Sequence, residues 1–154
     1  MEGRKTENEF DQLLERNDLK KTKPRLSVLK ILSSRETATS QPHLEEILGK
    51  EVDRVTLYRV LKTFEEKGII HKILDMNGTA NYATCDKSCS EQKHDDKHVH
   101  FNCTVCLNVY CLDELHLPKL SMPAGFTTAN VTLIVYGICD KCNKKAEEYI
   151  KNKD

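Results

Sequence analysis

Four cysteines in the second half of the chain are arranged as two identical pairs. Two residues separate Cys103 from Cys106, and two separate Cys139 from Cys142. Such knuckles can supply four thiolates in a tetrahedron, the usual coordination of structural zinc, with Zn–S bonds of about 2.3 Å. Because the segment between the pairs is longer than in compact zinc ribbons, we expect the ion to join separate strands.

Other cysteine chemistries fit the sequence less well. No βαβ pattern surrounds either pair, as a thioredoxin-like redox motif would need. The H-x-E and P-C-x-x-C elements of a zinc deaminase are missing from the sequence. The chain has seven cysteines, an odd number that leaves one thiol over in any full disulfide framework. Metal binding is therefore the favoured hypothesis, and four reduced cysteines with unrelated roles are the alternative.

A second set of metal-ligating residues precedes and follows the first pair. His98 and His100 are two residues apart, so on a strand they would share a face. Cys111 lies on the next expected strand, whereas His71 and Cys85 belong to an earlier hairpin and its exit. A site built from all five would join the two halves of the chain and couple ion binding to their arrangement. The alternatives are a pair of surface histidines and a cysteine that acts as a small apolar residue.

Composition divides the chain into two parts. It has 154 residues, 38% hydrophobic, with 24 basic and 24 acidic side chains, so it can bury a core and wholesale disorder is not expected. All the cysteines follow residue 84, which predicts one domain over 1–84 and another over 85–154. No stretch reaches the roughly 18 apolar residues of a membrane span. The N-terminus lacks an export signal, so we expect a cytoplasmic protein without a membrane partner.

The first half predicts a winged-helix domain. Helical spacing, Pro24, Ser40 and Asp53 indicate four helices, near residues 7–17, 24–34, 41–48 and 54–67. A hairpin follows, with strands near 69–74 and 79–84 around the turn signal Asn77-Gly78. A short helix, a tight turn, a longer helix and a hairpin wing are typical of DNA-binding domains.

The fourth helix has two different faces. Leu57, Val60, Leu61 and Phe64 would pack inward, and the opposite face carries Arg54, Val55, Tyr58, Arg59 and Lys62. Arginines can read guanine edges or phosphates, and an aromatic ring can contact a thymine methyl. The basic segment 20–25 could reach phosphates or a minor groove. The alternative is an ordinary amphipathic helix with a solvated charged face.

The second half predicts a small α/β module, so the whole chain is expected to be α+β. We expect strands near 99–103 and 109–112, a short helix from 113 toward 120, and a long strand over 126–137. The final residues are predicted to fray.

In order along the chain, four motifs resemble the ferric uptake regulator (Fur) family of metal-sensing transcription factors. They are LKKTKPR at 19–25, DRVTLYRVLKTFEEKGII at 53–70, HVHFNCTVC at 98–106 and VYGICDKC at 135–142. The resemblance implies a homodimer with a winged-helix domain and an α/β dimerisation domain. It also implies that the protein binds palindromic double-stranded DNA operators and represses metal-uptake or metal-homeostasis genes.

The resemblance assigns roles to single residues. The family's minor-groove lysine falls on Lys20, its threonine on Thr56 and its base-contacting pair on Tyr58 and Arg59. Lys21, Arg25 and Arg54 complete the predicted DNA-binding set. The structural zinc ligands fall on the four paired cysteines, Cys103, Cys106, Cys139 and Cys142.

The regulatory site departs from the family pattern. The sensory pair falls on His98 and His100, but a family carboxylate is replaced by Cys111, and a third metal site is missing its histidine, with Val131 in its place. His71 and Cys85 are like the zinc uptake regulator branch, and thiolates favour zinc over ferrous or manganous ions.

Zinc is therefore the favoured regulatory metal, and iron or manganese remains open. The alternatives are an iron or peroxide sensor of the same family and a zinc-dependent enzyme with water at an open coordination position. No recognised catalytic motif supports an enzyme, and no small-molecule substrate is expected.

Overall fold

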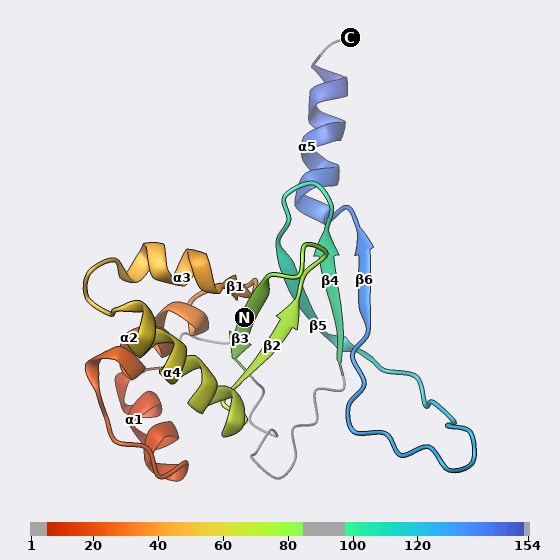
Figure 1. Ribbon diagram of the computed structural model, residues 1–154. Coiled ribbons are helices and arrows are strands. Elements are labelled where there is room, and N and C mark those ends of the chain that lie inside the picture. The colour runs from red at the N-terminus through yellow and green to blue at the C-terminus, as the bar shows by residue number, and fades with distance from the viewer. Residues whose placement is uncertain (1–5, 85–97, 153–154) are drawn as a thin grey trace. The chain divides into compact units, whose positions relative to one another are not determined.

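The computed structural model describes residues 6–84 and 98–152. The chain separates into two compact units, residues 1–96 and 97–154, which are described one at a time (Figure 1). The fold is α+β: the described part of the first unit has helices α1 to α4 and a three-stranded sheet, and that of the second has a three-stranded sheet and helix α5. The predicted boundary at residues 84 and 85 lies at the edge of the undescribed segment and stays a prediction.

The first unit has the predicted winged-helix architecture, and its four helices end within one residue of their predicted bounds. The sheet has the order β1-β3-β2 and is antiparallel throughout, and its short first strand was not predicted. The elements are α1 (Glu7–Arg16), α2 (Lys23–Ser33), β1 (Thr39–Ser40), α3 (Gln41–Leu48), α4 (Arg54–Glu66), β2 (Ile70–Leu74) and β3 (Ala80–Thr84).

Local side-chain contacts fix where α3 and α4 begin. The Ser40 hydroxyl accepts a hydrogen bond from the His43 amide at 3.3 Å. The Asp53 carboxylate accepts one from the Thr56 amide at 3.0 Å. Each cap satisfies an amide that has no partner inside its helix. The turn between the two helices therefore has a defined exit, and α4 starts at a fixed residue.

The glycine that follows helix α4 allows the chain to change direction. Gly68 has φ +68°, a left-handed conformation that costs glycine nothing. The Ile69 amide then donates to the Phe64 carbonyl at 2.9 Å, and the Gly68 amide donates to the Glu65 carbonyl at 3.1 Å. This pair of bonds is a Schellman motif, which turns the chain directly into β2.

The hairpin between β2 and β3 is organised by one carboxylate. Asp75 accepts hydrogen bonds from the amides of Asn77 and Thr79, both at 2.9 Å, and from the Asn81 side chain at 3.1 Å. Gly78 has φ +75° within this turn. The predicted turn is present, although its loop covers residues 75–79 because Leu74 pairs with Ala80.

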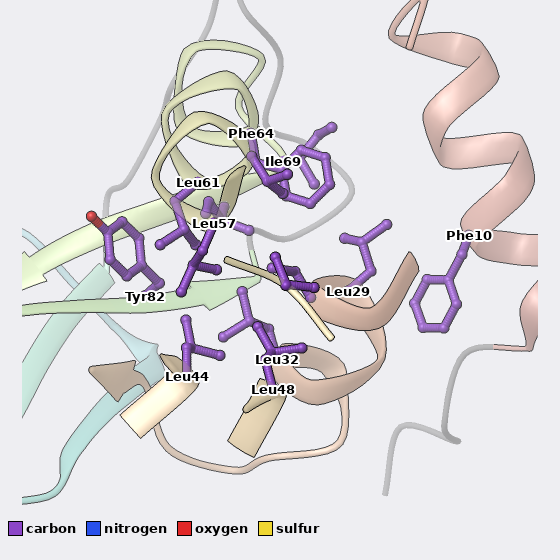
Figure 2. Packing of buried hydrophobic residues seen from close by; sticks show 14 of the residues in the cluster. Phe10, Leu29, Leu32, Leu44, Leu48, Leu57, Leu61, Phe64, Ile69 and Tyr82 are labelled. Atoms are coloured by element: carbon purple, nitrogen blue, oxygen red, sulfur yellow. The ribbon is translucent and has the colours of Figure 1, made fainter. Parts of the chain in front are cut away.

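A single apolar core holds the first unit together (Figure 2). Phe64 of α4, Leu29 of α2 and Leu44 of α3 are fully buried and meet there. Tyr82 of β3 closes the core from the sheet side. The helices therefore bury their apolar stripes against one another, which leaves the opposite face of α4 exposed.

The second unit is built around strand β4 (Figure 1). Its sheet has the order β5-β4-β6, with β5 antiparallel and β6 parallel to β4. His100 of β4 pairs directly with Cys111 of β5. The elements are β4 (His98–Cys103), β5 (Val109–His116), β6 (Ile134–Gly137) and α5 (Asp140–Lys151).

Two sequence predictions for this unit were wrong, and one helix was not predicted. The helix expected from 113 toward 120 is absent, because β5 continues to His116, which pairs with His98 across a register shift. The long strand expected over 126–137 is reduced to β6, the part that pairs with β4. Helix α5 was missed, although Ala146, Tyr149 and Ile150 are spaced as on one helical face.

Candidate metal centres and nucleic-acid interface

The four paired cysteines converge in the second unit, as the sequence predicted. Their four Sγ atoms all lie within 4.8 Å of one another. Cys103 ends β4 and Cys106 lies in the turn that follows, whereas Cys139 precedes α5 and Cys142 lies in its first turn. Residues from both ends of the unit therefore meet at this cysteine cluster.

Backbone contacts hold the two knuckles together. The Cys139 amide donates to the Cys103 sulfur at 3.4 Å, and so does the Val105 amide. The Thr104 amide donates to the Gly137 carbonyl at 2.7 Å, which ties the first knuckle to the end of β6. Leu107 leaves this knuckle with φ +63°, an uncommon conformation for leucine.

The cysteine cluster has the dimensions that zinc requires. Zn–S bonds of about 2.3 Å at the tetrahedral angle place neighbouring sulfurs about 3.8 Å apart. The Sγ atoms of Cys106 and Cys139 are separated by 3.8 Å. With all four Sγ atoms within 4.8 Å of one another, the four thiols fit a structural zinc ion.

The protonation of the cysteine cluster also fits a dication. Burial acts to raise the pKa of Cys103, but backbone amides of Cys106, Cys139 and Val105 outweigh it and bring the pKa to about 6. The Tyr110 hydroxyl, which donates at 3.5 Å, lowers the pKa of Cys139. A hydrogen bond to Cys139 raises the pKa of Cys142 to about 12. The lowered pKa values of Cys103 and Cys139 favour thiolate ligands, and a bound dication would assist loss of the Cys142 proton.

Three of the five predicted sensory residues form a second cluster within the same unit. His98, His100 and Cys111 each place a ligand atom within 4.8 Å of those of the other two. The centroids of the two imidazole rings lie 4.6 Å apart. Two nitrogens and one sulfur are therefore available on neighbouring strands, at a spacing that one ion can span.

In this second cluster, burial favours the neutral imidazole of His100. Burial, with a smaller contribution from His98, lowers the pKa of His100 to about 4. A neutral ring keeps a lone pair for a metal. Asp113, in the stretch where β5 shifts register, has its Oδ1 3.7 Å from Nε2 of His98.

The other two predicted sensory residues lie outside the described part of the second unit. His71 is buried on β2 of the first unit, where it pairs with Ala83. Cys85 lies outside the described residues, as does Cys89.

Helix α4 presents the predicted outward face. Val55 and Tyr58 are 58% and 55% exposed, and Arg59 is also exposed. The side chains of Tyr58 and Arg59 make no hydrogen bond or ion pair with any residue of the described ranges 6–84 and 98–152. Both side chains are therefore available to a ligand on this face of the first unit.

The basic segment is anchored to helix α1 and to its own backbone. The Lys21 ammonium lies 2.8 Å from Asp11 and 3.7 Å from Glu15, and its pKa is raised chiefly by the Asp11 hydrogen bond. Arg25 donates from Nη1 to the Lys20 carbonyl at 2.7 Å. The Lys20 side chain is exposed.

Two further predicted DNA-binding residues have partners near the start of α4. Arg54 donates from Nε to Oε1 of Glu45 at 3.1 Å, a contact that is the main cause of the lowered pKa of Glu45. The Thr56 hydroxyl donates to Asp53 at 2.5 Å, and this bond is the main cause of the lowered pKa of Asp53. Thr56 therefore has a structural role at the helix N-terminus.

Sequence reasoning did not anticipate the roles of Tyr110 and Glu45. Tyr110 could have been suspected, because it lies on the strand beside the first knuckle. No sequence signal pairs Glu45 with Arg54, since their contact depends on the angle between α3 and α4.

A winged-helix unit followed by a unit with two candidate metal centres defines a class of metal-responsive DNA-binding regulators. The model of the ferric uptake regulator family matches residues 16–136, and the chain belongs to this family. The resemblance seen in the four sequence motifs is thus confirmed.

Named relatives agree with this assignment. A ferric uptake regulation protein of Neisseria meningitidis is 30% identical over 145 residues, covering 87% of this chain and 93% of the relative. The ferric uptake regulation protein of Legionella pneumophila is 31% identical over 142 residues, covering 87% of this chain and 98% of the relative. A solved zinc uptake regulator complexed with zinc and DNA shares the fold, with a TM-score of 0.65, 19% identity and coverage of 89% of this chain and 92% of the other.

The protein is a metal-sensing transcriptional regulator and not an enzyme. The zinc-enzyme alternative is therefore set aside. Within the described residues, no helix is long and apolar enough to cross a membrane.

Proposed function

We propose that the protein is a zinc-responsive repressor that binds palindromic operators of metal-uptake or metal-homeostasis genes in the cytoplasm. The observation that carries the choice of zinc is Cys111, which pairs with His100 across β4 and β5. A thiolate beside two imidazoles suits zinc better than ferrous or manganous ions, which prefer shells richer in carboxylate and imidazole.

The proposed regulatory site consists of His98, His100 and Cys111, together with His71 and Cys85 as further predicted ligands. A regulatory ion bound here would shift the population toward a DNA-binding form, by as much as its affinities for the two forms differ. The cysteine cluster of the second unit is proposed to hold a separate, structural zinc ion.

The proposed DNA-binding surface is the outward face of α4 with the basic segment before α2. Tyr58 and Arg59 would contact bases, whereas Lys20, Lys21 and Arg25 would bind phosphates or a minor groove. When DNA binds, the Lys21 ammonium would either leave Asp11 and Glu15 of α1 or contact DNA while it remains paired with them.

A homodimer is proposed from the apolar side chains that the second unit leaves exposed. They include Val135 and Tyr136 on β6 and Tyr149 and Ile150 on α5, all at least 43% exposed. Exposed apolar groups on this scale commonly mark an interface. Two copies would also match a palindrome with two winged helices.

Iron sensing is the second candidate function. It is favoured by the curated relatives at about 30% identity, which are named ferric uptake regulation proteins. Cys111 argues against it, because the family resemblance predicts a carboxylate at this position.

The test is DNA binding by the full chain after metal removal, refilling of the structural site with one equivalent of Zn(II), and addition of Zn(II), Fe(II) or Mn(II), with metal counted in each sample. We expect zinc to restore binding at two ions per protomer. The matched variant Cys111→Glu introduces the carboxylate of the family pattern and should shift the preference toward iron or manganese.

Other outcomes separate the parts of this proposal. Binding restored in the wild type by iron or manganese, with one zinc retained, would overturn the choice of zinc and leave the DNA-binding assignment intact. No binding with any of the three metals would overturn metal-dependent DNA binding itself.

A further inference from the structure

An ion pair crosses the helix-turn-helix of the first unit. Glu45 lies on α3, and Arg54 is the first residue of α4. Their atoms Oε1 and Nε are 3.1 Å apart. The same Oε1 accepts a hydrogen bond from Gln41, one turn earlier on α3, at 3.2 Å. The carboxylate is thus held from both sides.

The two partners differ in exposure. The Glu45 side chain is 26% exposed, whereas that of Arg54 is 79% exposed. Ion pairs with a partner this exposed contribute little to stability. The contact therefore does more to orient the guanidinium than to hold α3 and α4 together, a task that the apolar core already performs.

The geometry leaves a specific part of Arg54 available. Of its five N–H donors, the one on Nε is directed to Glu45, so the two terminal Nη groups remain as a fork. Such a fork matches the O6 and N7 acceptors of guanine in the major groove. Fixing the side chain beforehand reduces the conformational entropy lost when that contact forms.

The position on the helix suits this task. Recognition helices contact base edges with residues near their N-terminal ends, and Arg54 begins α4. Tyr58 lies one turn further on the same exposed face. Arg54 would thus read a base pair next to those that Tyr58 and Arg59 contact.

We propose that Glu45 is a positioning residue that fixes Arg54 to read a guanine, and so sets one base pair of the operator preference. This inference rests on the proposed DNA-binding function and adds a specificity determinant to it. A carboxylate near DNA also repels phosphates. Its two effects have different signatures, because repulsion weakens binding to every sequence and positioning acts on one base pair.

The experiment uses the metal-reconstituted full chain. The wild type first selects its preferred duplex from a random pool, and competition binding then measures discrimination at each position by single base-pair changes. Four variants are compared: Glu45→Gln, which removes the charge at nearly constant shape, Arg54→Ala, the double variant, and the control Glu46→Gln, an equal charge change on the next, exposed residue of α3. Thermal melting confirms that each variant is folded.

We expect Arg54→Ala to lose roughly 5- to 150-fold discrimination at one G·C pair of each half-site. Glu45→Gln should lose at least about threefold at that same pair and leave the other positions unchanged. The double variant should match Arg54→Ala, because Glu45 acts through the arginine. Glu46→Gln should keep the full pattern of preference.

Three results would overturn the inference. Glu45→Gln could behave like the control, with affinity raised for all duplexes and preference unchanged, which would reduce Glu45 to a repulsive charge. A further loss of discrimination in the double variant would mean that Glu45 does not act through Arg54. A wild type that selects no duplex with any metal would overturn the proposed function and this inference with it.

Discussion

The two units of the molecule are stabilised in different ways. In the first, apolar side chains from α1 to α4 and the sheet form one core, with Leu57 and Phe64 fully buried (Figure 2). Among the described residues, none of the second unit belongs to that core, and the largest fully buried side chains of the second unit are His100, Val109 and Asn102.

The second unit also exposes apolar groups that a core would bury. Phe126, Tyr149 and Ile150 are at least 63% exposed. We therefore expect the first unit to fold by apolar burial, and the second to depend on metal ligation and on a partner surface.

Loss of the cysteine cluster should have the largest effect. In Cys103→Ser, or after zinc removal, we expect β4, β6 and α5 to lose hydrogen-exchange protection while α2 and α4 keep theirs. The reason is that the binding free energy of a structural zinc is also folding free energy. Hydrogen exchange with mass spectrometry measures this, and Cys111→Ser is the control outside the cysteine cluster. Unchanged protection in β4 and α5 would contradict the dependence on metal.

Truncation of the apolar core should affect the first unit alone. Phe64→Ala should cost about 3–5 kcal/mol of unfolding free energy, because it removes a fully buried ring. Denaturant unfolding measures the cost, and zinc counting should show the cysteine cluster still filled. Val55→Ala, on the exposed face of the same helix, should change stability by less than about 0.5 kcal/mol. Equal effects of the two substitutions would contradict the assigned core.

Removal of the hydroxyl beside the cysteine cluster should weaken zinc binding. Tyr110→Phe deletes the hydrogen bond to the Cys139 sulfur, and we expect roughly a tenfold loss of zinc affinity. Chelator competition measures it. Tyr136→Phe is the matched control, because Tyr136 lies on β6 and is half exposed. The same affinity in both variants would show that Tyr110 does not act on the metal centre.

Relief of backbone strain should stabilise the second unit. Leu107 has φ +63°, so Leu107→Gly should gain about 1 kcal/mol at the knuckle, after the extra freedom of glycine in the unfolded chain is subtracted. In the first unit, Asp18 has φ +55°, but aspartate tolerates this conformation, and Asp18→Gly should change stability by less than about 0.5 kcal/mol. Thermal melting of the zinc-loaded proteins compares the two variants. A lower melting temperature for Leu107→Gly than for the wild type would contradict backbone strain at Leu107.

The smallest effect concerns pH and the cap of α4. Hydrogen bonds from Thr56 lower the pKa of Asp53 below its usual 3.8. Stabilisation from this cap is therefore full above the usual pKa and is lost as the pH falls through the lowered one. We expect the wild type to have a higher melting temperature than Asp53→Asn at pH 7, and the difference to shrink as the pH falls below the usual pKa of the carboxylate. A difference that persists in acid would contradict the role of the ionised carboxylate.

The contrast between the units explains where sequence-based prediction succeeded. Helices of the first unit follow from periodic apolar residues, the caps Ser40 and Asp53, and the stop at Gly68, all of which act within a few residues. In the second unit, the strand-favouring composition of residues 126–137 predicted a strand that was too long, because only residues 134–137 pair with β4. A β-strand needs a neighbour, and local sequence does not specify one.

The sequence by itself determined the family, the winged helix and the types of metal ligand, because motif spacing and helical periodicity are local properties. Tertiary structure decided that His98, His100 and Cys111 lie within reach of one ion, that Tyr110 donates to Cys139, and that Glu45 holds Arg54. Those contacts depend on strand register and on the angle between helices, which result from the packing of residues distant in the sequence.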